Sequence, residues 1–235
     1  LVLIRCCKVV SAAYLDCRCY SDPLAGFVLL SMGFAAALLA RQTDFKRMLA
    51  YSSVEHVGIL ALALGVGKGA FFGMMLHMLG NGLAKGALFL SSGTLHRVYG
   101  GKGTAGMSGA LRRLPWSGGI FLAGFLAVSA FPPSLIFLSE LGIATSAFRS
   151  GNWQAGSIFL ILLVFVFLGM APTVLGMVLG SPPPHMPETE HKESLLHIAP
   201  PLLLILLVMI LGVWMPEPLA RLLRDAAALI SGGCR

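Results

Sequence analysis

Charged residues are scarce in this sequence. Only 11% of the 235 residues are Asp, Glu, Lys or Arg, whereas 57% are hydrophobic and the mean hydropathy is +0.84. Soluble globular domains carry about 25% charged residues. The composition therefore excludes a soluble domain. It predicts an integral membrane protein with room for about six spans of roughly 20 residues each.

Motifs for cofactor binding and covalent catalysis are absent as well. No P-loop, dinucleotide fingerprint or GxSxG motif occurs, and the glycines at 100–109 lack the P-loop order. The cysteines form no CxxC pair and no Cys/His ligand set. We therefore expect no active site, cofactor, metal or iron–sulfur site on this chain. All five cysteines lie near its ends: Cys6, Cys7, Cys17, Cys19 and Cys234.

A net charge of +7 is the one feature that would suit a nucleic-acid partner. The chain has no basic run and no interleaving of basic and aromatic residues, so we expect no nucleic-acid binding. Lysines and arginines in loops that face anionic lipid explain the charge instead.

The hydrophobic segments predict an all-α, polytopic transmembrane helix bundle with one discontinuous helix. Pro132-Pro133 interrupts the fourth segment, and because proline removes a backbone donor, we expect a kink or a non-helical stretch within 130–136. Residues 217–231 have the pattern of an amphipathic helix on the membrane surface. Residues 1–21 suit the tail of a preceding helix plus a loop, and 181–194 suits an exposed loop. The expected spans are 24–40, 48–64, 69–99, 116–148, 155–179 and 196–214.

Loop charges predict the orientation. The loops 41–47, 97–115 and 181–194 hold eight Lys and Arg residues, and the opposite loops between helices hold only Lys68 and Arg149. The positive-inside rule makes the first side cytoplasmic and places the C-terminus outside. Six basic residues near the two chain ends reduce this bias.

The segment 69–99 carries polar residues where a span is normally apolar. His77, Asn81 and Lys85 are spaced four residues apart and so lie along one stripe of a helix. A charged residue at the bilayer centre costs about 2.5–3.5 kcal/mol on insertion scales. Two interpretations follow: the stripe handles protons, or Lys85 belongs to an ion pair that only holds the bundle together. Asn81 does not titrate and serves either to hold water or to bond a neighbouring helix.

Other ionisable residues extend this pattern to neighbouring spans. Glu55 is a candidate for the proton route or a static partner of Lys85 or Lys46, and Glu140 follows the proline break, where a broken helix normally lines a cavity. His56, adjacent to Glu55, is expected to pack or to hydrogen-bond. Lys46 ends a loop and suits an interface anchor.

Two stretches carry a family resemblance. DFKRMLAYSSVEHVGILALALG (44–65) and LHMLGNGLAKGALFLSSG (76–93) resemble the antiporter-like membrane subunits of complex I, the Mrp antiporters and energy-converting hydrogenases. AYSSVEH and FPPSLIFLSE (131–140) most resemble hydrogenase-4 component F and its formate hydrogenlyase relatives. The resemblance covers about residues 24–231, and it implies that 22–231 is the C-terminal half of such a domain within a longer protein.

The resemblance implies a proton or sodium channel subunit without quinone or cofactor, working beside redox subunits in the inner (plasma) membrane. By position, Lys46 matches the lysine of the DxKR motif, His77 and Lys85 match the family's His–Lys stripe, and Glu140 matches a Lys or Glu on the broken helix. Asn81 departs from the second histidine of that stripe. SLIFLSE also replaces the usual glycine-containing run after the double proline.

The expected function is therefore a proton-translocating, antiporter-like subunit of a hydrogenase or formate hydrogenlyase-type complex. The alternatives are a complex I-type or Mrp-type Na⁺/H⁺ antiporter subunit and a structural membrane anchor that moves no ions. The expected proton-pathway residues are Lys85, His77, Glu140, Lys46, Glu55 and Asn81.

Overall fold

The computed structural model describes residues 18–39, 42, 44–100, 107–181 and 193–231, and these residues are almost entirely helical. The all-α prediction is confirmed. Two predictions fall largely outside the described residues. They are the tail and loop at 1–21, of which 1–17 are not described, and the loop at 181–194, of which 182–192 are not described. Five long helices coincide with predicted spans: α2 (Arg18–Leu39), α3 (Phe45–Val66), α4 (Phe71–Tyr99), α8 (Trp153–Leu179) and α9 (Leu195–Val213).

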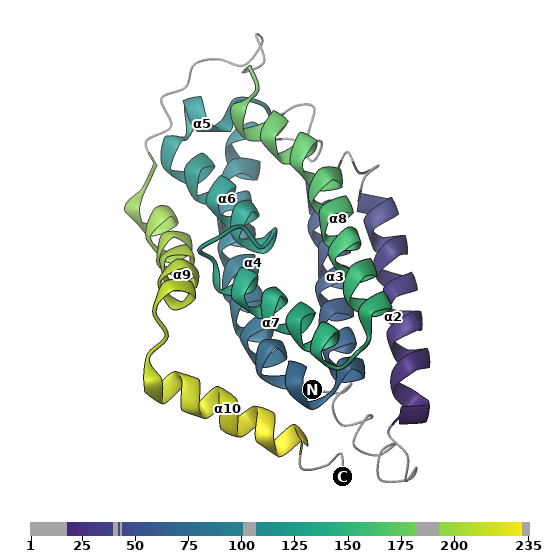
Figure 1. Ribbon diagram of the computed structural model, residues 1–235. Helices are drawn as coiled ribbons and strands as arrows, with labels where there is room; N and C mark the ends of the chain where they lie inside the picture. The colour runs from purple at the N-terminus through teal and green to yellow at the C-terminus, as the bar shows by residue number, and fades with distance from the viewer. Residues whose placement is uncertain (1–17, 40–41, 43, 101–106, 182–192, 232–235) are drawn as a thin grey trace.

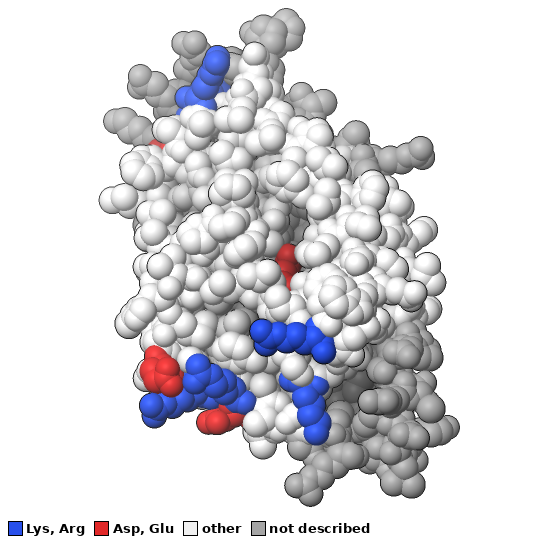
Figure 2. Space-filling view, viewed as in Figure 1, with Lys and Arg blue, Asp and Glu red and all other residues white. Residues whose placement is uncertain are grey.

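Three of these helices, α3, α8 and α9, are long and apolar enough to cross a membrane by length and composition. Ala25–Leu39 within α2 and Pro115–Val128 are shorter apolar helices. The outer surface has a matching character, since Phe165 and Leu168 of α8 are 60% and 59% exposed. Figure 2 shows charged side chains toward the two ends of one face, with a broad band between them that is almost uncharged. Such a surface suits lipid rather than water.

The fourth hydrophobic region consists of two helices, α6 (Pro115–Val128) and α7 (Leu135–Arg149), with the short α5 (Ala110–Arg113) before them. The predicted interruption within 130–136 is confirmed. In Figure 1 the connection between α6 and α7 lies at mid-height in the bundle, between the other helices.

The residues of this break satisfy much of their own backbone. Phe131 N donates to Leu126 O at 2.9 Å, and Ser134 N donates to Phe131 O at 3.0 Å. Ser134 then caps α7, because its Oγ accepts a hydrogen bond from Phe137 N at 3.2 Å. These bonds reduce the cost of non-helical backbone at membrane depth. Ala130 adopts a left-handed conformation with φ 53°, which costs a non-glycine residue about 1–2 kcal/mol.

Helix α4 has the central position and packs against α3, α6, α7, α9 and α10. Two glycines on one face permit its approach to α7. A Cβ at Gly73 would lie 3.1 Å from Ser139 O, and a Cβ at Gly80 would lie 3.0 Å from Ile136 Cγ1. His77 sits between these glycines on the same face, at the i, i+4, i+7 spacing. The small residues therefore let α7 come close enough to contact the His77 side chain.

Two further contacts tie the ends of the bundle together. Helix α10 (Glu217–Ser231) runs across the lower end in Figure 1, and its Arg224 guanidinium lies over the Phe72 ring of α4 at 5.8 Å from the centroid. At the start of α6, the Glu193 carboxylate accepts hydrogen bonds from Trp116 N and Ser117 N at 3.0 and 2.9 Å. A carboxylate at a helix N-terminus is favourable for both the hydrogen bonds and the helix dipole. The amphipathic helix predicted at 217–231 is confirmed, since Ala220, Leu223, Ala227 and Ile230 form one buried face.

The close approach of α4 and α7 makes a testable prediction. Replacing Gly80 by Leu should destabilise the full-length protein by about 1–3 kcal/mol, because the new side chain overpacks the Ile136 contact. Gly82→Leu is the matched control, since a Cβ there meets nothing within 4 Å. Thermal unfolding of the purified protein in detergent measures both. Equal melting temperatures for the two variants would contradict the proposed close packing.

Candidate functional site

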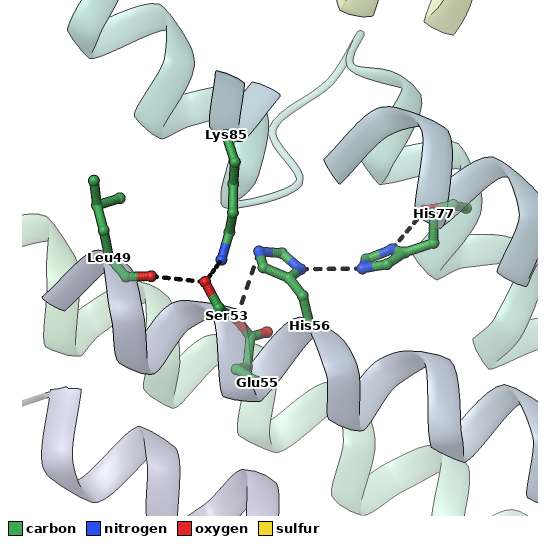
Figure 3. A network of polar contacts seen from close by, with 7 residues as sticks. Leu49, Ser53, Glu55, His56, His77 and Lys85 are labelled. Carbon is green, nitrogen blue, oxygen red and sulfur yellow. Dashed lines mark hydrogen bonds and ion pairs between the residues drawn. The ribbon is translucent and has the colours of Figure 1, made fainter. Parts of the chain in front are cut away.

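Buried polar side chains from three helices meet inside the bundle. Among the described residues, the buried acidic, basic and histidine side chains are Glu55 and His56 of α3, His77 and Lys85 of α4, and Glu140 of α7, each between 0% and 8% exposed. Figure 3 shows the α3 and α4 side chains pointing toward one another. Because unpaired polar groups are costly in such a place, their mutual contacts define the site.

The two histidines form the centre of this network. His56 Nδ1 lies 3.0 Å from His77 Nε2, and His77 Nδ1 lies 2.9 Å from Ser139 Oγ. The Ser139 hydroxyl in turn lies 2.6 Å from Ile136 O. Hydrogen bonds thus connect α3 through α4 to α7 in an unbroken row (Figure 3).

The direction of these hydrogen bonds follows from their last member. A carbonyl oxygen only accepts, so the Ser139 hydroxyl donates to Ile136 O and accepts from His77 Nδ1–H. In a neutral imidazole the other nitrogen is then an acceptor, so His77 Nε2 accepts from His56 Nδ1–H. The same rule leaves His56 Nε2 with a lone pair. That nitrogen is buried and has no hydrogen-bond partner among the described residues.

A carboxylate stands next to this unsatisfied nitrogen. Glu55 Oε2 lies 3.8 Å from His56 Nε2, too far for a direct hydrogen bond but close enough for an ion pair if the histidine is protonated. Glu140 also approaches the pair: ligand atoms of His56, His77 and Glu140 all lie within 4.8 Å of one another. The histidine pair is thus flanked by two buried carboxyl groups.

Lys85 reaches the same region by a different contact. Its Nζ donates to Ser53 Oγ at 2.7 Å, and the Ser53 hydroxyl donates to Leu49 O at 3.1 Å. No ion pair joins Lys85 to a carboxylate in the part of the chain that the structure describes. The static Lys85–Glu55 pair, one of the alternatives drawn from the sequence, is therefore not formed as a direct contact.

A cavity of about 360 Å³ adjoins the site. Glu55 and Glu140 line it together with Ser129 and Ala130 of the break and apolar residues of α8. Figure 2 shows an acidic patch within a hollow of the otherwise uncharged band. The cavity is roomy enough for several water molecules, and the carboxyl groups supply the polar partners that buried water requires.

The structure separates the residues predicted from the sequence into two groups. It brings Glu55, His77, Lys85 and Glu140 together. Asn81 is half-buried on α4, and its Oδ1 has no hydrogen-bond partner among the described residues. Lys46 is exposed at the start of α3, beside the Asp44 cap, and lies outside the network.

Three members of the network were not among the predicted pathway residues. His56 was expected to pack or to hydrogen-bond, and it does form a hydrogen bond, with His77 Nε2. Ser53 and Ser139 were not singled out at all. The sequence did contain one indication for Ser53. Its i, i+3 spacing from His56 puts both residues on one face of α3.

Comparison with known proteins agrees with this architecture. Residues 2–168 match the family described as NADH:quinone oxidoreductase/Mrp antiporter, transmembrane region. The chain belongs to this family. It is an integral membrane protein of the antiporter-like type, as the resemblance drawn from its motifs implied.

Individual relatives in this antiporter-like family cover only part of the chain. The hydrogenase-4 component F homolog of Methylacidiphilum infernorum is 37% identical over 130 residues, which are 53% of this chain and 27% of that protein. The NADH-quinone oxidoreductase subunit N of Desulforudis audaxviator is 35% identical over 121 residues, 51% of this chain and 24% of that protein. The chain thus spans about a quarter of the length of these relatives.

A solved structure supports the fold over most of the chain. A chain of the membrane-bound sulfane sulfur reductase, an archaeal respiratory membrane complex, superposes with a TM-score of 0.80 and 27% identity. The match covers 90% of this chain and 42% of that one. The relatives named here are components or subunits of multi-subunit membrane complexes.

The tautomers deduced for the histidine pair can be tested directly. In full-length protein with ¹⁵N-labelled histidine, neutral His77 should carry its proton on Nδ1, because Ser139 accepts from that nitrogen. Ser139→Ala should release this preference and populate the Nε2–H tautomer. The imidazole ¹⁵N chemical shifts distinguish the two forms, and His77→Gln assigns the signals. Ser92→Ala is the control, because the Ser92 hydroxyl donates to Phe89 O within its own helix and lies outside the histidine row. An Nε2–H tautomer of His77 before any substitution would disprove the assigned direction.

Proposed function

We propose that this chain forms part of the proton pathway of an antiporter-like subunit in a hydrogenase or formate hydrogenlyase-type membrane complex. The observation that carries the proposal is the oriented hydrogen-bond row from His56 through His77 to Ser139, buried between three helices and flanked by Glu55 and Glu140. A row of this kind transfers protons only if each member both accepts and donates, and imidazoles meet that requirement.

The proposed transfer begins at the free lone pair. A proton delivered to His56 Nε2 makes that ring an imidazolium, and its Nδ1–H proton then passes to His77 Nε2 over the 3.0 Å hydrogen bond. His77 becomes doubly protonated in turn and delivers a proton toward Glu140, whose carboxyl group lies at the cavity. Each ring must then rotate or exchange its protons to restore the starting tautomers.

We assign Lys85 and Glu55 to the end of the row where a proton is delivered to His56. Ser53 of α3 accepts a hydrogen bond from the Lys85 ammonium of α4, which places that ammonium at the level of Glu55. Glu55 in turn faces the lone pair of His56 Nε2. A change in charge at Lys85 alters the electrostatic potential at both His56 and Glu55, since the interior dielectric screens charges weakly. We propose that this coupling makes proton release depend on the charge of Lys85.

Two predicted residues have peripheral roles in this scheme. Asn81 is half-buried and its Oδ1 has no hydrogen-bond partner among the described residues, so we assign it to hold a water molecule beside the α4 stripe. Lys46 is exposed at the start of α3 and is assigned to the approach from the membrane surface.

The hydrogenase assignment rests on the 37% identity with a hydrogenase-4 component F homolog. On this basis we propose that residues 22–231 act as the C-terminal half of an antiporter-like domain in the inner membrane, beside other membrane subunits and redox subunits. A complex I-type or Mrp-type Na⁺/H⁺ antiporter subunit is the second candidate, favoured by the 35% identity with the NADH-quinone oxidoreductase relative and by the family match. Sodium-dependent proton exchange by the purified protein without redox partners would select the Mrp type.

The decisive experiment replaces two ionisable groups beside the row, Lys85 and Glu140. Lys85→Met and Glu140→Gln should each abolish proton uptake into vesicles that contain the full-length protein in its assembled complex. The amount of complex and its redox activity should remain, because neither residue makes a direct ion pair within the described chain. Lys68→Met and Glu217→Gln are matched controls, since both residues are exposed and lie outside the network.

A structural anchor predicts different outcomes for the same variants. If the two charges only hold the bundle together, each single variant should lower the amount of assembled complex, and the double variant should restore it. Near-normal uptake in either single variant would place the proton route elsewhere.

A further inference from the structure

We propose that His56, His77 and Glu140 form a binding site for one divalent transition-metal ion between α3, α4 and α7. The motifs offered no reason to expect a metal, because the three ligands are distant along the chain and none belongs to a Cys/His motif. The proposal goes beyond proton transfer, since it concerns an ion that the pathway itself does not require.

The geometry of the three side chains is close to that of a metal site. One ligand atom from each residue lies within 4.8 Å of the other two. Tetrahedral ligands at 2.0–2.2 Å from Zn²⁺ are about 3.4 Å apart, so binding requires the widest pair to close by up to about 1.4 Å. The long side chain of Glu140 supplies this adjustment by rotation, because its carboxyl group borders the cavity rather than packed side chains alone.

The ligand types select a class of ion. Two imidazoles and one carboxylate suit Zn²⁺, Co²⁺ and Ni²⁺, whereas Na⁺, Mg²⁺ and Ca²⁺ prefer oxygen ligands alone. The lone pair of His56 Nε2, buried and without a hydrogen-bond partner among the described residues, shows that one imidazole has an unused ligating atom. A metal cation satisfies such a nitrogen by coordination, whereas water satisfies it by a hydrogen bond.

The surrounding residues complete the site in the way that metal centres require. His77 keeps its Nδ1–H on Ser139 Oγ, which holds the ring in place. Its Nε2 binds the metal by giving up the hydrogen bond that it accepts from His56 Nδ1–H. Glu55 Oε2, 3.8 Å from His56 Nε2, provides a second carboxylate next to the ligands. Two carboxylates balance the charge of a divalent ion, which removes the cost of a net charge in a buried site.

The cavity gives the ion a way in. Glu140 and Glu55 line the 360 Å³ cavity at the break, so a hydrated cation that reaches it meets carboxylates first and imidazoles behind them. Figure 2 shows the acidic patch in the hollow of that face. A metal bound here would occupy the nitrogens of the histidine row and stop proton transfer through it. That consequence rests on the proposed function, whereas metal binding itself does not.

The test measures Co²⁺ binding by the purified full-length protein, in a background where the chain's five cysteines are replaced by serine. Co²⁺ with nitrogen and oxygen ligands gives visible d–d absorption, so site occupancy is read without any transport assay. We expect one Co²⁺ per chain, displaced by Zn²⁺ and not by excess Na⁺ or Mg²⁺. His56→Ala, His77→Ala and Glu140→Gln should each weaken binding by at least about 10–100-fold.

The control for these variants is His197→Ala, an exposed histidine outside the site that should leave binding unchanged. His56→Gln serves as a second variant should His56→Ala fail to fold, since an amide fills the space and ligates these metals poorly. Absence of Co²⁺ from the intact protein, or unchanged binding in the folded His56 and Glu140 variants, overturns the proposal. If binding persists in these variants while their proton uptake is lost, the metal site fails and the proton route stands. The opposite pattern, loss of binding with normal uptake, leaves the metal site and refutes the route.

Discussion

Polar groups inside a membrane protein must find their partners within the protein, and in this chain that requirement is met where α4 packs against α7. Gly73 and Gly80 allow the two backbones to approach, and His77 between them reaches Ser139. A Cβ at either glycine would lie 3.0–3.1 Å from atoms of α7, so those atoms would have to shift by a few tenths of an ångström. The hydrogen bond that orients both histidines would then be lengthened, and the positions of Glu140 and of the break would shift with it.

The direction of the hydrogen-bond row depends on a residue without charge. Ser139 cannot titrate near neutral pH, yet its bond to Ile136 O decides which nitrogen of His77 carries the proton and, through it, which nitrogen of His56 remains free. Titratable groups alone would form a network with several equivalent arrangements. One serine bonded to its own helix selects among them. The site therefore combines ionisable groups, which change protonation state, with a serine that fixes the direction of their hydrogen bonds.

Much of the fold was predictable because hydrophobic segments of this length have few alternatives in a bilayer. The proline pair also located the break to within the residues where the structure has it. The stripe of His77, Asn81 and Lys85 followed from helical spacing alone. Spacing within one helix does not show which residues of other helices contact that stripe. The contact between His56 and His77, which are 21 positions apart, could therefore not be predicted from it. The glycine contacts that bring Ser139 of α7 to His77 depend on backbone distances that no pattern encodes.

Lys46 and Asn81 illustrate the opposite limit. Lys46 matches a position of a family motif, and Asn81 stands where another motif has a histidine. An alignment to a motif places residues in sequence order rather than in space. Lys46 belongs to the first turn of α3, where Asp44 caps the helix and solvent is accessible. The DFKR stretch therefore has a sufficient local explanation as a helix start, independent of ion transfer.

The interruption between α6 and α7 also has a mechanical consequence. A continuous helix transmits rotation about its axis, because each turn is bonded to the next. Between Val128 and Leu135 those bonds are replaced by a turn that includes left-handed Ala130, and the α9 backbone at Gly212 lies so close to Pro133 that a Cβ there would overlap its carbonyl oxygen. Torque applied to α6 is therefore not carried into α7. The orientation of Ser139 and Glu140 is set instead by the helices that pack against α7, namely α3, α4, α8 and α9.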